Sequence, residues 1–324
     1  MDIREKLYQM FILGLDGNGY KEALAKGLGG IIFFTKDIQT PEQFKNLCAE
    51  ITSQSKITPF LSIDQEGGRV ERTENIHGGK KYLSAKFAFE KGEEFLRNQT
   101  DEIAKELKSY GINMNFAPCI DVNTNPNNPI IGERAFSNNP EEVILGQRIV
   151  SATYRNNGII PCVKHFPGHG DANADSHLTL PQINLSLKEM EQTHIKPFAD
   201  AVKDGIEMVM VAHLHCTCFE KDEIPTSLSK NAINYLRNSL NFNGVAISDD
   251  MIMKGVAKFG AKTACEMGIR AGLNMFIYRN SLPETIDIIE FLVQKAQGDR
   301  ELFANIETSF EKIIELKKKF GLVK

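Results

Sequence analysis

Short apolar stretches recur eight times along this chain, separated by segments with helical periodicity. Each stretch is apolar almost throughout, which is typical of strands in a parallel sheet that is buried on both faces. The stretches are Met10–Leu13, Gly30–Phe34, Pro59–Ile63, Ile112–Ala117, Ile159–Val163, Met208–Ala212, Gly244–Ile247 and Asn274–Tyr278. Strands that alternate with helices predict an α/β fold, and eight of them predict a single (β/α)8 TIM barrel with an irregular first strand. A doubly wound open sheet is the alternative.

The segments between the apolar stretches carry signals for helix starts. Thr40-Pro41 and Asn139-Pro140 each place a capping side chain before a proline, and proline favours the first helical position. No linker rich in proline, glycine or serine interrupts the pattern. We therefore expect residues 1–324 to form one domain, with no second domain.

The charge balance limits the classes of partner. The net charge is −4 and the longest basic run is Lys317-Lys318-Lys319, which we interpret as a solvated helix end favoured by the helix dipole. Nucleic acid is therefore not an expected partner. No stretch reaches the roughly 18 apolar residues of a membrane span, and the charged start Met1–Lys6 is unlike a signal peptide. These features predict a cytoplasmic protein that does not bind membranes, and we expect a monomer.

The six cysteines fit the same compartment. Most of them stand singly in apolar or helical segments, where a buried free thiol is the ordinary state. Cys216 and Cys218 are separated by one residue, which is too close for the usual pair of zinc ligands. We expect reduced thiols and no metal at these positions.

Polar residues follow the third to the seventh apolar stretch. They are Asp64, Asp121, Lys164, His165, His213, Asp249 and Asp250. In a barrel these strand ends meet at one rim, where active sites are built. Helix capping could explain an aspartate here, but it does not explain a lysine or the histidines. We therefore predict a shared site, in which only one of the adjacent Asp249 and Asp250 faces the barrel mouth.

Two loops at the same rim carry arginines. Asp64–Arg72 contains Gly67-Gly68, which allow a tight backbone turn, and Asn128–Phe136 contains Arg134. The acids and arginines suit a hydroxylated, polar ligand, although ion pairs within the loops would use the same residues. Both interpretations are open from the sequence.

The loop after the fifth stretch is unusually rich in histidine. It reads Lys164–Gly170 and continues to Asp175-Ser176-His177, placing three of the seven histidines of the chain within it. Histidine has the side-chain pKa nearest neutrality. One interpretation is a metal site formed by His169, Asp175 and His177. Another is an Asp175–His177 dyad that transfers protons, and a third is a structural loop. Spacing alone does not decide among them.

These motifs together resemble family 3 glycoside hydrolases, specifically single-domain β-N-acetylglucosaminidases of the cell-wall-recycling type. The resemblance is carried by Lys-His-Phe-Pro-Gly-His-Gly at 164–170, Asp-Ser-His at 175–177, Asp-Gln-Glu-Gly-Gly-Arg-Val at 64–70 and Ser-Asp-Asp at 248–250. It runs through nearly the whole chain. It implies a TIM barrel and a retaining two-step mechanism without a cofactor or a metal.

The resemblance also implies roles for individual residues. Asp249 matches the nucleophile that forms a covalent glycosyl-enzyme intermediate, His177 matches the acid/base, and Asp175 would orient His177. The positions that match those holding N-acetylglucosamine in the first subsite are Asp64, Arg72, Arg134, Lys164 and His165.

The activity implied by the resemblance is exo-acting removal of terminal N-acetylglucosamine from peptidoglycan (muropeptide) fragments. Phosphorolysis of the same bond and a metal-dependent hydrolase on the same barrel are the alternatives. His215, Cys216 and Cys218 depart from the expected pattern, which makes the aglycone less certain than the sugar. The role of His169 is open.

Overall fold

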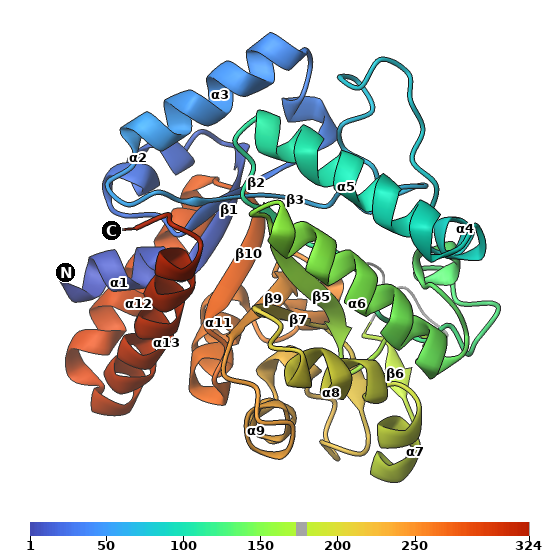
Figure 1. Ribbon diagram of the computed structural model, residues 1–324. Helices are drawn as coiled ribbons and strands as arrows, with labels where there is room; N and C mark the ends of the chain where they lie inside the picture. Colours follow the sequence, from blue (N-terminus) through green and yellow to red (C-terminus); the bar gives the residue numbers. More distant parts are fainter. Residues whose placement is uncertain (173–179, 324) are drawn as a thin grey trace.

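A closed barrel of eight parallel strands forms the centre of the computed structural model, which describes residues 1–172 and 180–323 (Figure 1). The barrel strands are β1 (Phe11–Asp16), β2 (Gly30–Phe33), β3 (Phe60–Ile63), β4 (Met114–Asn115), β5 (Ile160–Phe166), β7 (Met208–Val211), β9 (Val245–Asp250) and β10 (Met275–Asn280). Strand β1 pairs with both β2 and β10, so the sheet has no open edge. The closure confirms the (β/α)8 prediction and excludes the open sheet.

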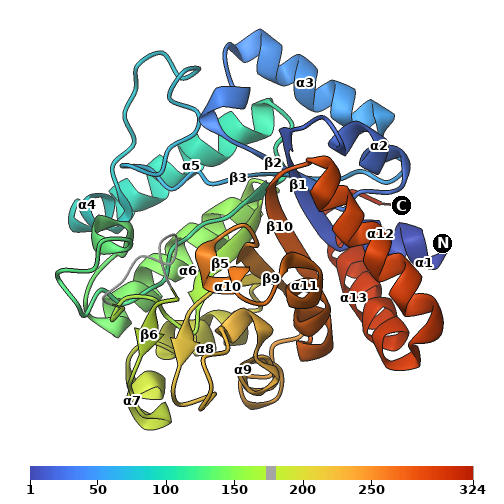
Figure 2. The same ribbon diagram turned by 180° about the vertical axis from the view of Figure 1, so that it is seen from behind.

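Helices surround the barrel. They are α1 (Ile3–Gln9), α2 (Tyr20–Ala25), α3 (Pro41–Gln54), α4 (Ala85–Glu90), α5 (Glu93–Ser109), α6 (Pro140–Asn156), α7 (Leu187–Gln192), α8 (Lys196–Lys203), α9 (Lys230–Asn234), α10 (Lys254–Ala257), α11 (Ala261–Ala271), α12 (Pro283–Gly298) and α13 (Arg300–Lys319). Figures 1 and 2 show α1, α12 and α13 grouped on one side, near both chain ends. Helix α3 begins as predicted, because Thr40 accepts a hydrogen bond from the Gln43 amide and Pro41 follows it.

The fourth strand is shorter than its apolar stretch predicts. Its ladder covers only Met114–Asn115, since asparagine side chains take over neighbouring backbone bonds. The Asn113 side-chain oxygen accepts from the Leu61 amide at 2.9 Å, and that of Asn115 accepts from the Gln65 amide at 3.0 Å. These buried amides tie the end of β3 to β4, which fixes the loop that leaves the rim after Ile63.

A further two-stranded parallel sheet lies outside the barrel. It pairs β6 (Gln182–Ile183) with β8 (His215–Cys216), and so joins the chain that follows β5 to the chain that follows β7. Two residues per strand are too few for a periodic pattern, so the sequence gives no signal for this sheet. It accounts for His215 and Cys216 as structural residues: both are buried, and the His215 ring Nε2 lies 2.9 Å from the Glu220 carbonyl oxygen.

One sequence prediction at the other end of the barrel is wrong. Lys317 is not a solvated helix end, because its side chain is completely buried beneath the barrel. Its Nζ donates to Gln9 Oε1 at 2.8 Å and to the Gly29 carbonyl oxygen at 3.0 Å. Lys317 lies four residues after the buried Ile313 on α13, so helical spacing places both on the face that packs inward.

All six cysteines are free thiols, in agreement with the sequence prediction. Among the helices of the described residues, none combines the length and the apolar character that a membrane span requires.

Candidate active site

A cavity of about 470 Å³ opens at the carboxyl ends of the barrel strands. Its wall includes residues that the sequence singles out: Asp64, Arg72, Arg134, Lys164, His165, His169, Asp249 and Asp250. They come from β5, β9 and the loops after β3, β4 and β5, which the closed barrel brings together at one rim. The structure therefore forms the predicted cluster, although the sugar-binding role of each member is a prediction.

A buried network of charges forms one side of this cavity. Lys164 Nζ lies 2.7 Å from Asp64 Oδ1 and 2.6 Å from Glu66 Oε1. Glu66 also accepts two hydrogen bonds from Arg134, from Nε at 2.9 Å and from Nη2 at 2.8 Å. Burial would raise the pKa of Glu66, but Arg134 and Lys164 bring it well below its ordinary value. The two cations thus share Glu66, and Asp64 adds a second carboxylate.

The same pairing keeps Lys164 charged. Burial would lower the pKa of Lys164, but Asp64 and Glu66 raise it above its ordinary value. Only one oxygen of Asp64 accepts a hydrogen bond within the described residues, and its side chain is 20% exposed. That carboxylate therefore retains acceptor capacity on the cavity side, which Glu66 does not.

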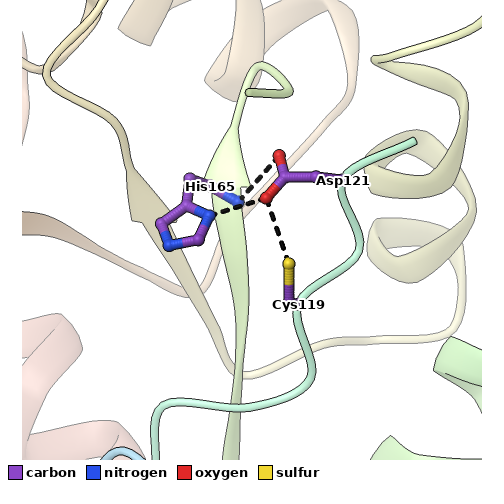
Figure 3. A group of neighbouring side chains, drawn as sticks. All are labelled: Cys119, Asp121 and His165. Atoms are coloured by element: carbon purple, nitrogen blue, oxygen red, sulfur yellow. Dashed lines mark hydrogen bonds and ion pairs between the residues drawn. The ribbon is translucent and has the colours of Figure 1, made fainter. Parts of the chain in front are cut away.

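The Asp121 carboxylate is hydrogen-bonded to the ring of His165 (Figure 3). His165 Nδ1 lies 2.6 Å from Asp121 Oδ2, and the other carboxylate oxygen accepts from the His169 amide at 2.6 Å. Because the carboxylate can only accept, Nδ1 carries the proton. Arg134 Nη2 is 3.3 Å from Nε2 of His165 and can only donate, so Nε2 is an acceptor. Both neighbours therefore select one tautomer.

Three potential metal ligands meet at this point. Atoms of Cys119, Asp121 and His165 all lie within 4.8 Å of one another. Cys119 Sγ donates to Asp121 Oδ2 at 3.2 Å, and Figure 3 shows both partners directed at the same carboxylate. Two ligands of one tetrahedral metal at about 2.0 Å each would lie about 3.3 Å apart, whereas Nδ1 and Oδ2 are only 2.6 Å apart. The geometry is that of a hydrogen-bonded support for His165.

The adjacent acids at the end of β9 have different partners. Asp250 forms an ion pair with Arg279. Asp249 Oδ1 accepts from the Asp250 amide at 2.7 Å, and within the described residues Asp249 forms no ion pair. Behind it, His213 Nε2 lies 3.1 Å from the Asp249 carbonyl oxygen, while Nδ1 lies 2.7 Å from Ser227 Oγ. His213 thus supports the backbone that presents Asp249 to the cavity.

The pKa values of these two acids shift in opposite directions. For Asp249, burial would raise the pKa, but His165 and His213, the Asp250 amide and Lys164 bring it below its ordinary value. For Asp250, burial dominates over Arg279, and its pKa is raised. Asp249 is therefore an ionised carboxylate without a cationic partner of its own, which is the state that a carboxylate nucleophile requires.

The loop after β3 carries Arg72 to the cavity. The guanidinium carbon of Arg72 lies 6.0 Å from the centre of the Phe34 ring, and its amide donates to Gln65 Oε1 at 2.7 Å. Gly67 has φ +92°, and a Cβ there would lie 2.3 Å from the Leu83 carbonyl oxygen. Only glycine fits this turn, so the Gly67-Gly68 motif sets the path of the loop that carries Arg72 to the cavity.

Three predicted residues are not described. Asp175, Ser176 and His177 lie outside the described residues, so the proton-transfer dyad and the metal set with His169 remain predictions. The site also contains residues whose roles the sequence prediction missed, above all Glu66. A signal existed, because Asp64 and Glu66 are two residues apart and an extended segment places such residues on one face.

The family model described as the glycosyl hydrolase family 3 N terminal domain matches residues 2–316. The chain belongs to this family. The predicted family is thereby confirmed, and with it the class of glycoside hydrolases.

Known proteins that are similar to this family 3 chain are named beta-hexosaminidases. Beta-hexosaminidase A of Pseudoalteromonas piscicida is 32% identical over 321 residues, covering 90% of this chain and 53% of that protein. Beta-hexosaminidase of Methylococcus capsulatus is 32% identical over 270 residues, covering 82% of this chain and 79% of that protein. The chain thus spans about half the length of the first relative.

A solved structure shares the family 3 barrel. The beta-N-acetylglucosaminidase from Paenibacillus sp. str. FPU-7 superposes with a TM-score of 0.91 at 29% identity, covering 99% of this chain and 63% of that one. Its match extends over the rim loops as well as the barrel, since almost the whole chain is covered.

Proposed function

We propose that the protein is an exo-acting, retaining β-N-acetylglucosaminidase that removes a terminal, non-reducing N-acetylglucosamine. The observation that carries the proposal is Asp249, an ionised carboxylate on the cavity wall without an ion-pair partner in the described residues. The charged groups around it, Lys164 and Asp64 among them, suit a hydroxyl-rich ligand. The names of the family 3 relatives support N-acetylglucosamine as the sugar.

The chemistry takes two steps. The Asp249 carboxylate attacks the anomeric carbon while the bond to the leaving oxygen breaks, and His177 gives its proton to that oxygen. In the second step His177 takes a proton from water, which attacks the same carbon and releases Asp249. Asp175 would hold the His177 ring and favour its charged form. The roles of His177 and Asp175 rest on the sequence motif.

The first subsite would hold the sugar through side chains that the protein already fixes in place. Asp64 offers a free carboxylate oxygen to sugar hydroxyls, and Lys164 has a third N–H beyond its two carboxylate partners. His165 and Arg134 are held by Asp121 and Glu66. Arg72, from the loop after β3, lies over the Phe34 ring. This preorganisation avoids reordering charges when the sugar binds.

The natural substrate in this proposal is a peptidoglycan fragment in the cytoplasm, with residues 1–324 acting as one catalytic domain. Support comes from the His/Asp loop motif at 164–177. A panel of N-acetylglucosaminides, glucosides and muropeptides, each with and without phosphate, tests this. Release of free N-acetylglucosamine from muropeptides is expected. Phosphate-dependent release of a sugar 1-phosphate would replace hydrolysis with phosphorolysis.

The nucleophile has a direct test. Cleavage of p-nitrophenyl N-acetyl-β-glucosaminide should fall by about 10⁴-fold or more in Asp249→Ala, because the covalent step is lost. A 5-fluoro glycoside should label the peptide at Asp249. Asp250 supplies the matched control, because it is the adjacent carboxylate but is paired with Arg279. Full activity of Asp249→Ala, or labelling at Asp250, would overturn the assignment.

A further inference from the structure

The imidazole ring of His169 is buried without a hydrogen-bonding partner. The residue is 3% exposed, and among the described residues neither Nδ1 nor Nε2 has a partner. His169 is nevertheless one of the residues that line the active-site cavity. A buried polar group without a partner destabilises the folded state, so each such group calls for an explanation.

The backbone of His169 is fixed on both sides. Its amide donates to Asp121 Oδ1 at 2.6 Å, and its carbonyl accepts from Asn128 Nδ2 at 2.8 Å and from the Ala172 amide at 3.2 Å. The main chain of His169 is therefore fully bonded, while the ring is not. Asp121 holds both His165 and His169, so the two histidines are positioned by one carboxylate.

The flanking glycines remove the remaining freedom. A Cβ at position 170 would lie 1.8 Å from the Val122 carbonyl oxygen, and one at position 168 would lie 2.6 Å from the His194 Cβ. Gly168 also has φ +123°, which favours glycine. These glycines allow close packing of the backbone, and so they fix the main chain on either side of His169.

The surroundings of the ring define what it can bind. The His165 ring lies edge-on at a centroid distance of 6.1 Å. Burial lowers the pKa of His169 below its ordinary value despite the nearby Asp121, so the ring is neutral near pH 7. A neutral imidazole has one donor and one acceptor nitrogen, and a hydroxyl group is also both donor and acceptor. A hydroxyl therefore pairs with either nitrogen.

We propose that His169 binds substrate directly, through a hydrogen bond between its ring and a hydroxyl group of the N-acetylglucosamine in the cavity. The inference deepens the proposed function and rests on it, since it adds a specificity-determining contact to the same site. A purely structural ring would need shape but no nitrogen atoms. A substitution that removes the nitrogens but keeps an aromatic ring therefore distinguishes a substrate-binding role from a purely structural one.

His169→Phe makes that change. With p-nitrophenyl N-acetyl-β-glucosaminide, kcat/KM should fall by about 10-fold or more, because one buried hydrogen bond to substrate is lost. The melting temperature should stay the same or rise, because an unpaired polar group has been removed. His194→Phe is the matched control: His194 is 1% exposed with an unpartnered Nδ1, but it does not line the cavity. It should keep kcat/KM within about 2-fold.

Deoxy sugars identify the hydroxyl. The 3-, 4- and 6-deoxy forms of the same glycoside are compared in the wild-type enzyme and in His169→Phe as double-mutant cycles. At the hydroxyl that bonds to His169, the deoxy substrate should lower kcat/KM of the wild-type enzyme by about 10-fold. In His169→Phe the same deoxy substrate should have the same kcat/KM as the parent glycoside, because the hydrogen bond is already lost. Additive losses at every position would overturn the proposal, as would His169→Phe with wild-type kcat/KM. A wild-type enzyme that cleaves no N-acetylglucosaminide would instead overturn the proposed function.

Discussion

Lys164 and Lys317 are both buried lysines, and they lie at opposite ends of the same barrel. At the rim, Lys164 Nζ contacts the carboxylates of Asp64 and Glu66 at 2.7 and 2.6 Å. Beneath the barrel, Lys317 Nζ contacts only the neutral oxygens of Gln9 and Gly29, and it lies 4.8 Å from the centre of the Phe60 ring. The carboxylates raise the pKa of Lys164, whereas burial lowers the pKa of Lys317 to about 7.

The difference shows how the two ends of the barrel treat charge. A buried cation costs several kcal/mol unless carboxylates compensate it. The rim supplies that compensation and so keeps a fixed positive charge at the cavity, which suits a site that binds a polar ligand. Around Lys317, the partners at the opposite end within the described residues are carbonyl-type acceptors. Lys317 there serves packing and hydrogen bonding, and its charge is dispensable.

Lys164→Met should have the largest effect among tests of this comparison. The change removes a charged group from the cavity wall and leaves Asp64 without its cation. We expect kcat/KM to fall by about 100-fold, the loss typical of a charge-assisted hydrogen bond to substrate. The free energy of unfolding should fall by up to about 3 kcal/mol, because a buried ion pair is broken on one side. Steady-state kinetics and urea unfolding measure the two effects.

If substitution of either lysine leaves kcat/KM unchanged, the proposed difference between the two ends of the barrel is wrong. Lys164→Met with kcat/KM within about 3-fold of the wild type would mean that the charge at the rim is structural. The matched control is the same substitution at the other buried lysine, Lys317.

Lys317→Met should leave kcat/KM within about 2-fold and change the dependence of stability on pH. In the wild type the folded state releases the lysine proton near pH 7, whereas the unfolded state holds it to about pH 10.4. The unfolded state therefore binds more protons between these values, so wild-type stability rises with pH in that window. The methionine variant lacks this rise. From pH 7 to 9 the wild type should gain about 2 kcal/mol relative to the variant.

Unfolding by guanidinium chloride at pH 7, 8 and 9 measures the relative gain directly. A constant difference between the two proteins across this range would show that Lys317 keeps an ordinary pKa in the folded state. Its burial would then be offset by its contacts with Gln9, Gly29 and the Phe60 ring.

The two lysines also show what the sequence can predict. The apolar stretches specify the barrel, and strand-end polarity leads to Lys164, because a barrel places every strand end at one rim. Lys317 stands in a run of three lysines at a helix end, which suggests solvent exposure. Its burial depends on how α13 rotates against α1 and β1, and no local pattern outweighs three adjacent charges. Glu66 was missed for a related reason, since its partners, Lys164 and Arg134, are far away in sequence.

Glu71 is the acidic counterpart of Lys317. Its side chain is largely buried near the rim, and among the described residues it forms no ion pair with Lys164 or Arg134. Burial raises its pKa to about 7, and the nearby Glu74 and Glu106 add to the shift, although Gln65 donates to it. Its closest titratable neighbour is His77, whose Nε2 lies 3.2 Å from Glu71 Oε1. The folded state therefore favours the protonated acid.

Glu71→Gln should give the smallest effect, and its sign follows from the raised pKa. An acid whose pKa is raised on folding contributes stability that is present at low pH and is lost as pH rises through the folded value, here about 7. The variant keeps a neutral amide at every pH, so it should gain about 1 kcal/mol on the wild type between pH 5 and 8, after allowance for solvent screening. Urea unfolding at both pH values measures this gain, with Glu74→Gln in the same loop as the exposed control. An equal gain in both variants would assign the effect to the net charge of the loop, whereas a gain confined to Glu71→Gln would assign it to burial. In the second case burial of Glu71 outside the cavity favours its neutral form, as burial of Lys317 does, whereas the cavity wall keeps Lys164 charged by placing carboxylates beside it.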